Sequence, residues 1–119
     1  MVESPLLTKS KAFALEIIRI CNEIKRSQKE SISTNQLVRS GTSIGANIRE
    51  AFYAHSKADF IAKFQIALKE CYETEYWIEL FVKSELLNRE IAKDLYNQCG
   101  TIRRMLIASI NTAKENQRL

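Results

Sequence analysis

Apolar residues recur along this chain at intervals of three and four positions, the spacing that places side chains on one face of an α-helix. Phe13, Ile17, Ile20, Cys21 and Ile24 show the pattern in the first part of the chain. Polar segments separate four such stretches, and each polar segment is short. The pattern predicts four helices, approximately over residues 8–26, 33–54, 56–85 and 88–114.

Polar residues mark the expected helix starts. Ser33 and Gln36 have capping-box spacing, in which the serine accepts a backbone N–H and the glutamine bonds back to the cap. Ser56 and Asn88 are predicted to cap the third and fourth helices. The fourth helix is expected to run to about Lys114 and to fray over residues 115–119.

The second helix carries two glycines, Gly41 and Gly45, in its interior, where each costs up to about 1 kcal/mol relative to alanine. Close approach of a neighbouring helix at this point would explain them. The apolar face of this helix is predicted to contain Leu37, Gly41, Ile44, Ile48, Ala51 and Phe52.

The third and fourth helices have regular apolar faces. In the third, a seven-residue repeat favours packing near a crossing angle of about 20°. Its members are Phe60, Phe64, Ala67, Cys71, Thr74, Ile78 and Phe81. The fourth presents Ile91, Leu95, Ile102, Met105 and Leu106. Short connections make neighbouring helices antiparallel, so the sequence predicts one all-α domain over residues 1–119, an up-down-up-down four-helix bundle.

The second helix also has a polar face beside its apolar one. The residues of this polar face are small or charged. They either face water or form a buried seam with Glu70 and Glu73, where each must find a hydrogen-bond partner. The sequence leaves both arrangements open for Gln36, Ser40, Ser43, Asn47 and Glu50.

The third helix has more apolar surface than one bundle face requires. Ala62, Ile66, Trp77 and Leu80 project away from its core face. They either close a wide monomer core, stand as scattered exposed residues, or form a subunit interface. Because they cluster around the only tryptophan, we expect Ile66, Trp77 and Leu80 to contact another subunit.

The residue composition limits the kinds of functional site that the chain can contain. The 119 residues include three cysteines and one histidine, His55, and carry a formal net charge of +4. The cysteines are widely spaced and fall on apolar faces, so they are expected to be structural. The chain begins without a signal-peptide pattern and has no long apolar run, so a cytoplasmic protein without a membrane span is expected.

No catalytic or metal-binding motif is evident. A single histidine excludes a two-histidine metal clamp within one chain, and the glutamates of residues 70–79 lack the Glu-x-x-His spacing of dimetal bundles. The glycines of residues 41–45 lie in a helical pattern rather than in a phosphate-binding loop. We therefore predict no enzyme activity, no cofactor and no metal.

Positive charge is concentrated in the terminal helices. Residues 9–30 and 89–119 each hold six basic and three acidic residues, whereas residues 57–85 hold four basic and six acidic ones. A basic surface favours an acidic partner. The candidate nucleic-acid-binding residues are Arg19, Arg26, Lys29, Arg103 and Arg104.

Residues 36–51 (QLVRSGTSIGANIREA), 56–60 (SKADF) and 66–77 (IALKECYETEYW) are distinctive. Together they resemble the bacterial four helix bundle protein family. Its members include proteins encoded by intervening sequences of 23S rRNA genes and the related accessory variability determinant of diversity-generating retroelements.

This resemblance implies an antiparallel four-helix bundle, a homopentameric ring, and association with nucleic acid or with a protein partner such as a reverse transcriptase. Our leading hypothesis is a non-enzymatic, oligomeric nucleic-acid-binding or accessory protein, with RNA preferred over DNA as the ligand. The alternative is a scaffold that recruits a protein partner through exposed apolar helix surface. The two differ in salt dependence, because phosphate contacts release counterions.

Overall fold

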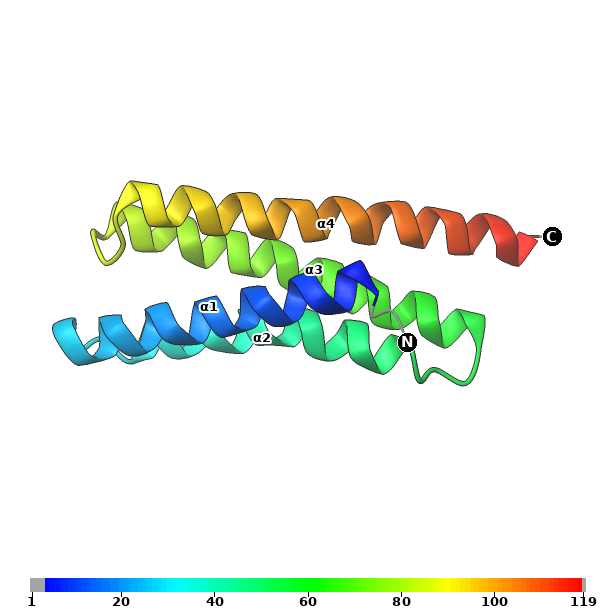
Figure 1. Cartoon of the computed structure of the whole chain (residues 1–119), viewed down its shortest axis with the longest axis horizontal. Coiled ribbons are helices and arrows are strands. Elements are labelled where there is room, and N and C mark those ends of the chain that lie inside the picture. Colours follow the sequence, from blue (N-terminus) through cyan, green and yellow to red (C-terminus); the bar gives the residue numbers. More distant parts are fainter. Residues whose placement is uncertain (1–3, 119) are drawn as a thin grey trace.

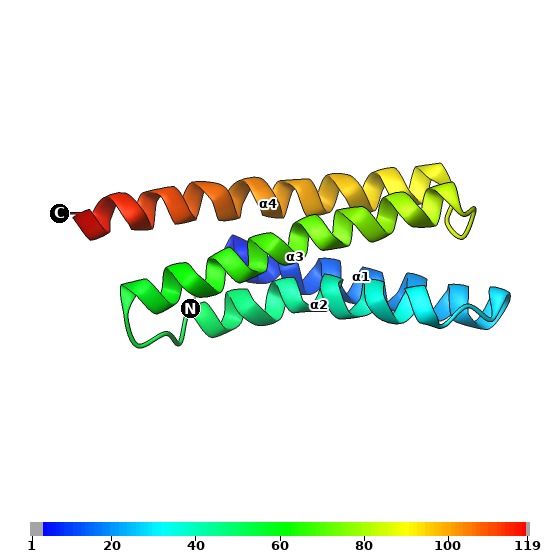
Figure 2. The ribbon, with the colours of Figure 1, turned by 180° about the vertical axis from the view of Figure 1, so that it is seen from behind.

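The computed structural model describes residues 4–118 and consists of four helices joined by short connections. The helices are α1 (Pro5–Gln28), α2 (Ile32–Ala51), α3 (Lys57–Lys83) and α4 (Arg89–Arg118). Each runs antiparallel to the one before it, as Figure 1 shows, and the view from behind in Figure 2 shows α3 lying against both α2 and α4. The molecule is elongated, 52 × 24 × 23 Å. The predicted antiparallel four-helix bundle is confirmed.

Helix ends differ from the prediction in ways that local chemistry explains. α1 begins at Pro5 rather than near residue 8, because proline suits the first helical turn, where its missing N–H is not needed. α4 continues through Lys114 to Arg118, so the fraying expected for residues 115–118 is wrong, and Leu119 lies outside the described residues. Ser56 and Asn88 do cap their helices, accepting the backbone N–H of Asp59 at 3.1 Å and of Ile91 at 2.9 Å.

The predicted capping box at the start of α2 is wrong. The helix begins at Ile32, and the carboxylate of Glu30 replaces the serine as the capping acceptor. Its Oε1 accepts the Ser33 backbone N–H at 2.8 Å and the Ser33 hydroxyl at 2.7 Å. These bonds hold the pKa of Glu30 below its ordinary value, since they stabilise the charged form.

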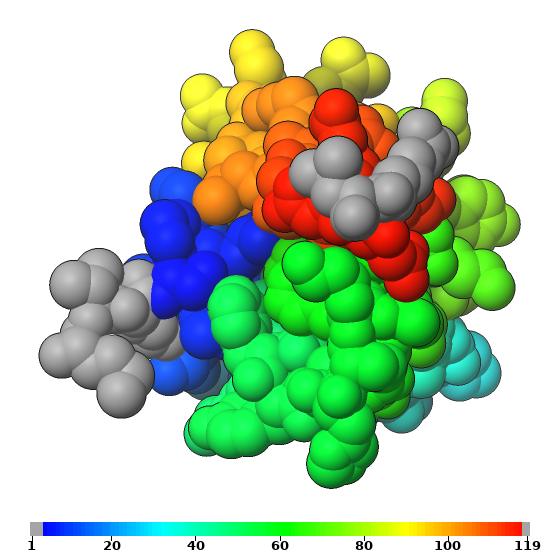
Figure 3. Space-filling view, turned by 90° about the vertical axis from the view of Figure 1, so that its right-hand side faces the viewer, coloured from blue at the N-terminus to red at the C-terminus, as the bar shows by residue number. Residues whose placement is uncertain are grey.

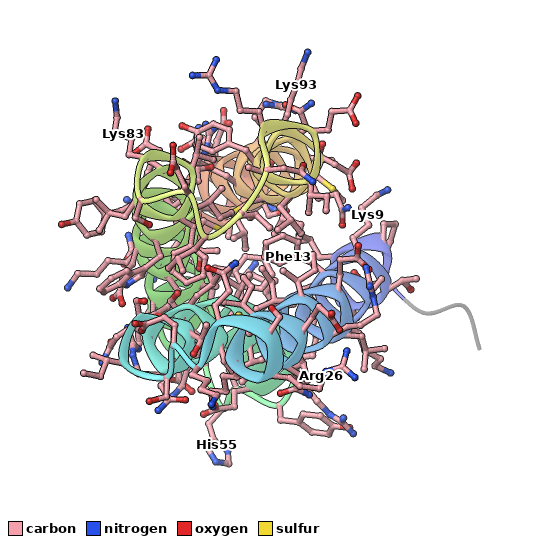
Figure 4. All side chains as sticks on the ribbon, turned by 90° about the vertical axis from the view of Figure 1, so that its left-hand side faces the viewer. Lys9, Phe13, Arg26, His55, Lys83 and Lys93 are labelled. Atoms are coloured by element: carbon pink, nitrogen blue, oxygen red, sulfur yellow. The ribbon has the colours of Figure 1, made fainter. Side chains whose placement is uncertain are left out.

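The core runs the length of the bundle. Figure 4, viewed along the bundle, shows Phe13 in the space between the helices, and Phe13, Phe64 and Phe81 are fully buried. Two residues predicted for the apolar faces are exposed instead. Phe52 is 47% exposed because α2 ends at Ala51, and Ile91 is 41% exposed in the first turn of α4.

The two interior glycines of α2 lie where α1 crosses closely, as predicted. A Cβ added at Gly41 would lie 3.1 Å from Cγ2 of the buried Ile17. A Cβ added at Gly45 would lie 3.2 Å from Oγ of Ser10, itself buried. Glycine at both positions therefore sets the spacing between α1 and α2.

Ion pairs join α3 to the helices on either side. Arg39 of α2 pairs with Glu70 at 3.3 Å and also with Glu73, whose carboxylate accepts the Trp77 indole N–H at 3.2 Å. On the other side of α3, Arg103 of α4 pairs with Glu75 at 2.9 Å.

The polar face of α2 divides between the two arrangements that the sequence left open. Gln36 faces water, Glu50 is exposed but pairs with Lys63 of α3 at 3.2 Å, and Ser40 is buried. The Ser40 hydroxyl donates to the Leu37 carbonyl of its own helix at 3.3 Å, so it needs no partner on α3. Glu70 and Glu73 are instead met by Arg39, from an adjoining position on α2.

Figure 3, a space-filling view of the opposite end, shows the C-terminal end of α4 close to the green segment that contains the α2–α3 connection. Lys57 and Phe60 at the start of α3 line a small hollow there with residues 108–116 of α4. The other end holds a larger groove, described below.

Candidate nucleic-acid interface

The two predicted arginines of α1 are engaged within their own helix. Arg19 donates to Glu16 at 3.0 Å, and Arg26 pairs with Glu23. Both arginine side chains are highly exposed, 68% and 76%, so these pairs contribute little stability. Each glutamate nevertheless cancels the positive charge beside it, which weakens the attraction of this helix for phosphate.

The structure also separates the predicted α1 residues from those of α4. Figure 4 shows Arg26 extending from the lower side of the bundle and Lys93 of α4 extending from the upper side. Lys29 ends α1 in a left-handed conformation, with φ of 56°, and is exposed. The five predicted residues therefore do not form one continuous surface.

Arg103 does not project freely into solvent as predicted. Its Nε donates to Oε2 of Glu75 at 2.9 Å, and its guanidinium lies 5.9 Å from the centre of the Tyr72 ring. Glu75 is only 6% exposed, and its hydrogen bond to Arg103 raises the pKa of that guanidinium. The side chain is held between α3 and α4 while part of it remains at the surface.

A row of cationic residues follows the outward side of α4. At 100° per residue, its members fall within about 80° of the helix circumference. All are exposed, and none has an acidic partner among the described residues. We call this row the α4 basic face; it consists of Arg89, Lys93, Arg104 and Lys114.

Of these residues, only Arg104 was among the sequence-predicted sites. The spacings of 4, 11 and 10 positions were visible in the sequence. What the sequence did not show was the ion pair of Arg103 with Glu75 of α3, and that these four cations of α4 have no acidic partner among the described residues.

An open groove of about 1030 Å³ lies beside the first part of this face, between α3 and α4. Its wall is mixed in charge and contains one half-buried aromatic ring. The residues that give the groove its chemistry are Glu79, Lys83, Glu85, Arg89, Lys93 and Tyr96.

The predicted interface residues of α3 differ in exposure. Ile66 is 42% exposed, whereas Trp77 and Leu80 are half-buried, with the Trp77 ring edge-on to Tyr76 at 5.5 Å between centroids. Tyr72 and Tyr76, which the sequence analysis did not select, are 51% and 54% exposed. We call Ile66, Tyr72, Tyr76, Trp77 and Leu80 the α3 apolar face.

Other groups show no second site. His55 is exposed, and Figure 4 shows it pointing away from the bundle. Burial raises the pKa of Cys21 to about 11, and the contact with Cys71, together with burial, raises that of Cys99. In residues 4–118 we find no cluster of three metal-ligating side chains, and no helix there is long and apolar enough to span a membrane.

These features define a small helical-bundle protein with charged outer faces. The model of the 23S rRNA-intervening sequence protein family matches residues 3–108, and the chain belongs to that family. This confirms the resemblance found in the sequence.

The bundle is also similar to the crystal structure of a protein of unknown function from the S23 ribosomal protein family of Bacteroides thetaiotaomicron. The two are 47% identical with a TM-score of 0.87, and the match covers 88% of this chain and 97% of that one. No curated protein matches the chain.

Proposed function

We propose that this chain is a non-enzymatic, oligomeric protein that binds the phosphate backbone of RNA through the α4 basic face. The observation that carries the proposal is the row of exposed cations on α4, which have no acidic partner in the part of the chain that the structure describes. Such a row attracts polyanions by releasing their counterions. The similar structure comes from a family named for a ribosomal protein, which agrees with an RNA ligand.

The surface favours contacts with backbone over contacts with bases. Its functional groups are long cationic side chains on the convex side of a helix, suited to phosphate oxygens rather than to unstacked base edges. Tyr96 in the adjoining groove offers aromatic surface on which a base can stack. We therefore expect binding with little sequence preference.

Charge reversal on α4 tests the proposal. The variant Lys93→Glu/Arg104→Glu removes two phosphate contacts, so the slope of log K against log salt for single-stranded RNA falls by about 1.4, at about 0.7 per phosphate. The variant Arg49→Glu/Lys69→Glu is the control, because it changes the net charge by the same amount as the α4 variant but at positions on α2 and α3. The measurement is fluorescence anisotropy of a labelled RNA at two or more salt concentrations.

Arg26→Glu adds a second comparison, since Arg26 lies on the opposite side of the bundle from Lys93. Affinity is expected to change little in this variant. Wild-type protein that does not bind RNA at low salt, or equal losses in the α4 and control variants, would contradict the proposal.

A protein-scaffold function is the second candidate, favoured by the α3 apolar face. A cluster of exposed and half-buried aromatic and aliphatic side chains on one helix is typical of an interface. We propose that this face joins copies of the chain, and the family resemblance leads us to expect a pentamer. We also propose that the same face, or a similar apolar face on another helix, recruits a protein partner.

Self-association is tested by light scattering after gel filtration. Wild-type protein is expected to elute well above the 13.7 kDa of one chain. Ile66→Glu should shift it toward the monomer, while Leu15→Glu, at a 63% exposed position on α1, should not. A wild-type monomer at micromolar concentration would refute the interface.

A further inference from the structure

Gly100 lies in the interior of the longest helix, where glycine is unfavourable, and no neighbouring helix explains it. Gly41 and Gly45 face atoms of α1. At Gly100, by contrast, the three atoms nearest to an added Cβ all belong to arginine side chains of α4 itself. Its position, one turn before Arg104 and two turns after Lys93, is on the outward side of the helix.

Two guanidinium groups meet over this glycine. A Cβ at Gly100 would lie 3.2 Å from Nη1 of Arg104 and 3.3 Å from Nη2 of Arg103. Helical side chains lean toward the helix N-terminus, so arginines three and four positions ahead cover the same patch of backbone. Gly100 is buried, and among the described residues the side-chain atoms nearest to the added Cβ are those of these two arginines.

Each guanidinium is oriented by a second contact. Arg103 is fixed through its Nε by Glu75, at 2.9 Å, which leaves its terminal nitrogens for another acceptor. Arg104 donates from Nη2 to the Thr101 hydroxyl at 3.3 Å, so its Nη1 faces the glycine. Glu75 compensates one of the two positive charges, and no carboxylate among the described residues pairs with the other.

We propose that Gly100, Arg103 and Arg104 form an arginine cradle that binds one phosphodiester group of a nucleic-acid backbone. This inference rests on the proposed function for the source of the phosphate and identifies the central contact. A phosphodiester has two unesterified oxygens, and two guanidinium groups can each donate to one of them. Because position 100 has no Cβ, nitrogens of both guanidinium groups lie within 3.3 Å of one point above the helix, close enough together to donate to the same anion.

The cradle lies in the middle of the α4 basic face. At 1.5 Å per residue, Lys93 is about 10 Å before Gly100 and Lys114 about 21 Å beyond it along the helix axis. A backbone phosphate held at the cradle therefore leaves neighbouring phosphates within reach of these lysines. The cradle fixes the position of the strand, and the lysines add charge on either side.

The test fills the cradle without removing charge. Gly100→Leu occupies the position over which the two guanidinium groups lie, while Ala46→Leu adds the same side chain at an exposed position on α2. RNA affinity, measured by anisotropy, should fall about tenfold in Gly100→Leu, as for loss of one charge-assisted hydrogen bond, and stay unchanged in Ala46→Leu. A thermal melt of each variant confirms that both fold.

A titration with inorganic pyrophosphate separates the cradle from RNA binding. In wild-type protein the NMR signals of the Arg103 and Arg104 Nε–H groups should shift with pyrophosphate, and in Gly100→Leu the shifts should shrink. If RNA binds both proteins equally and the α4 charge reversal still abolishes binding, the cradle is wrong and the proposed function stands. If the wild type binds neither RNA nor pyrophosphate, both are wrong.

Discussion

The contrast between Gly41 and Gly100 makes a sharp prediction about packing. Both are glycines in helix interiors, so replacement by alanine gives the same gain in helix propensity, about 1 kcal/mol. They differ in what the new methyl group meets. At Gly41 it meets Cγ2 of Ile17 at 3.1 Å, whereas at Gly100 it meets only the flexible ends of two arginines.

The cost at Gly41 follows from the stiffness of its neighbour. Ile17 is fully buried, and a β-branched side chain in a helix has one strongly preferred rotamer, so it cannot turn aside. Overpacking of this kind costs about 1–3 kcal/mol. Gly41→Ala should therefore lose up to about 2 kcal/mol net, while Gly100→Ala should gain about 1 kcal/mol.

The assay is thermal unfolding followed by far-ultraviolet circular dichroism, with all proteins at one concentration because self-association affects the midpoint. At about 4 °C per kcal/mol, the two variants should differ by about 4–12 °C in Tm. If Gly41→Ala melts as high as Gly100→Ala, close approach of α1 is not the reason for the glycine.

Three further predictions follow from contacts between helices. Gly45→Leu should lower stability by about 1–3 kcal/mol because the side chain must displace Ser10 of α1, and urea denaturation measures the loss. Glu75→Ala should lower stability by about 1–3 kcal/mol, because it leaves the guanidinium of Arg103, whose side chain is only 23% exposed, without its partner. Glu75→Gln should recover part of this stability in the same urea denaturation assay. Hydrogen bonds from Arg39 and Trp77 hold the pKa of Glu73 below its ordinary 4.5. The contribution of Glu73 to the free energy of unfolding is therefore complete above pH 4.5 and is lost as the pH falls through the lowered pKa. Acid titration of stability should show this loss in the wild type and a smaller one in Arg39→Gln, and equal losses in the two proteins would refute it.

Periodicity was sufficient to predict the helices because each helix buries one face and repeats its pattern over several turns. It failed where a helix stopped. Phe52 fits the spacing of α2, but the helix has already ended at Ala51, and the ring turns to the surface beside Phe60 and Phe64. The cap of α2 was not predicted because Glu30, which supplies it, lies before Ser33 and Gln36, the pair predicted to form a capping box.

The candidate site was harder to predict than the fold, since it depends on charges from different helices. A helical projection of α4 alone places Arg103 near the surface. Its partner Glu75 lies 28 positions earlier on α3, and only the packing of the two helices brings them together. The pairing of Arg19 and Arg26 with glutamates three positions earlier was, by contrast, visible in the sequence.

The bundle has two kinds of contact between helices, and the two kinds respond differently to solution conditions. α3 is linked to α2 and to α4 through carboxylates, whereas α1 meets α2 where Gly41 and Gly45 allow close approach. Acid or high salt weakens the first kind and leaves the second, which depends on shape, largely intact.

The order of local opening follows from this difference. Under acid stress the ion pairs of Arg39 with Glu70 and Glu73 should loosen before the packing of α1 on α2 does, so that backbone amides in the middle of α3 exchange with solvent deuterium earlier than those of α1 and α2. A binding partner that acidified or screened the surface of α3 would favour the same opening.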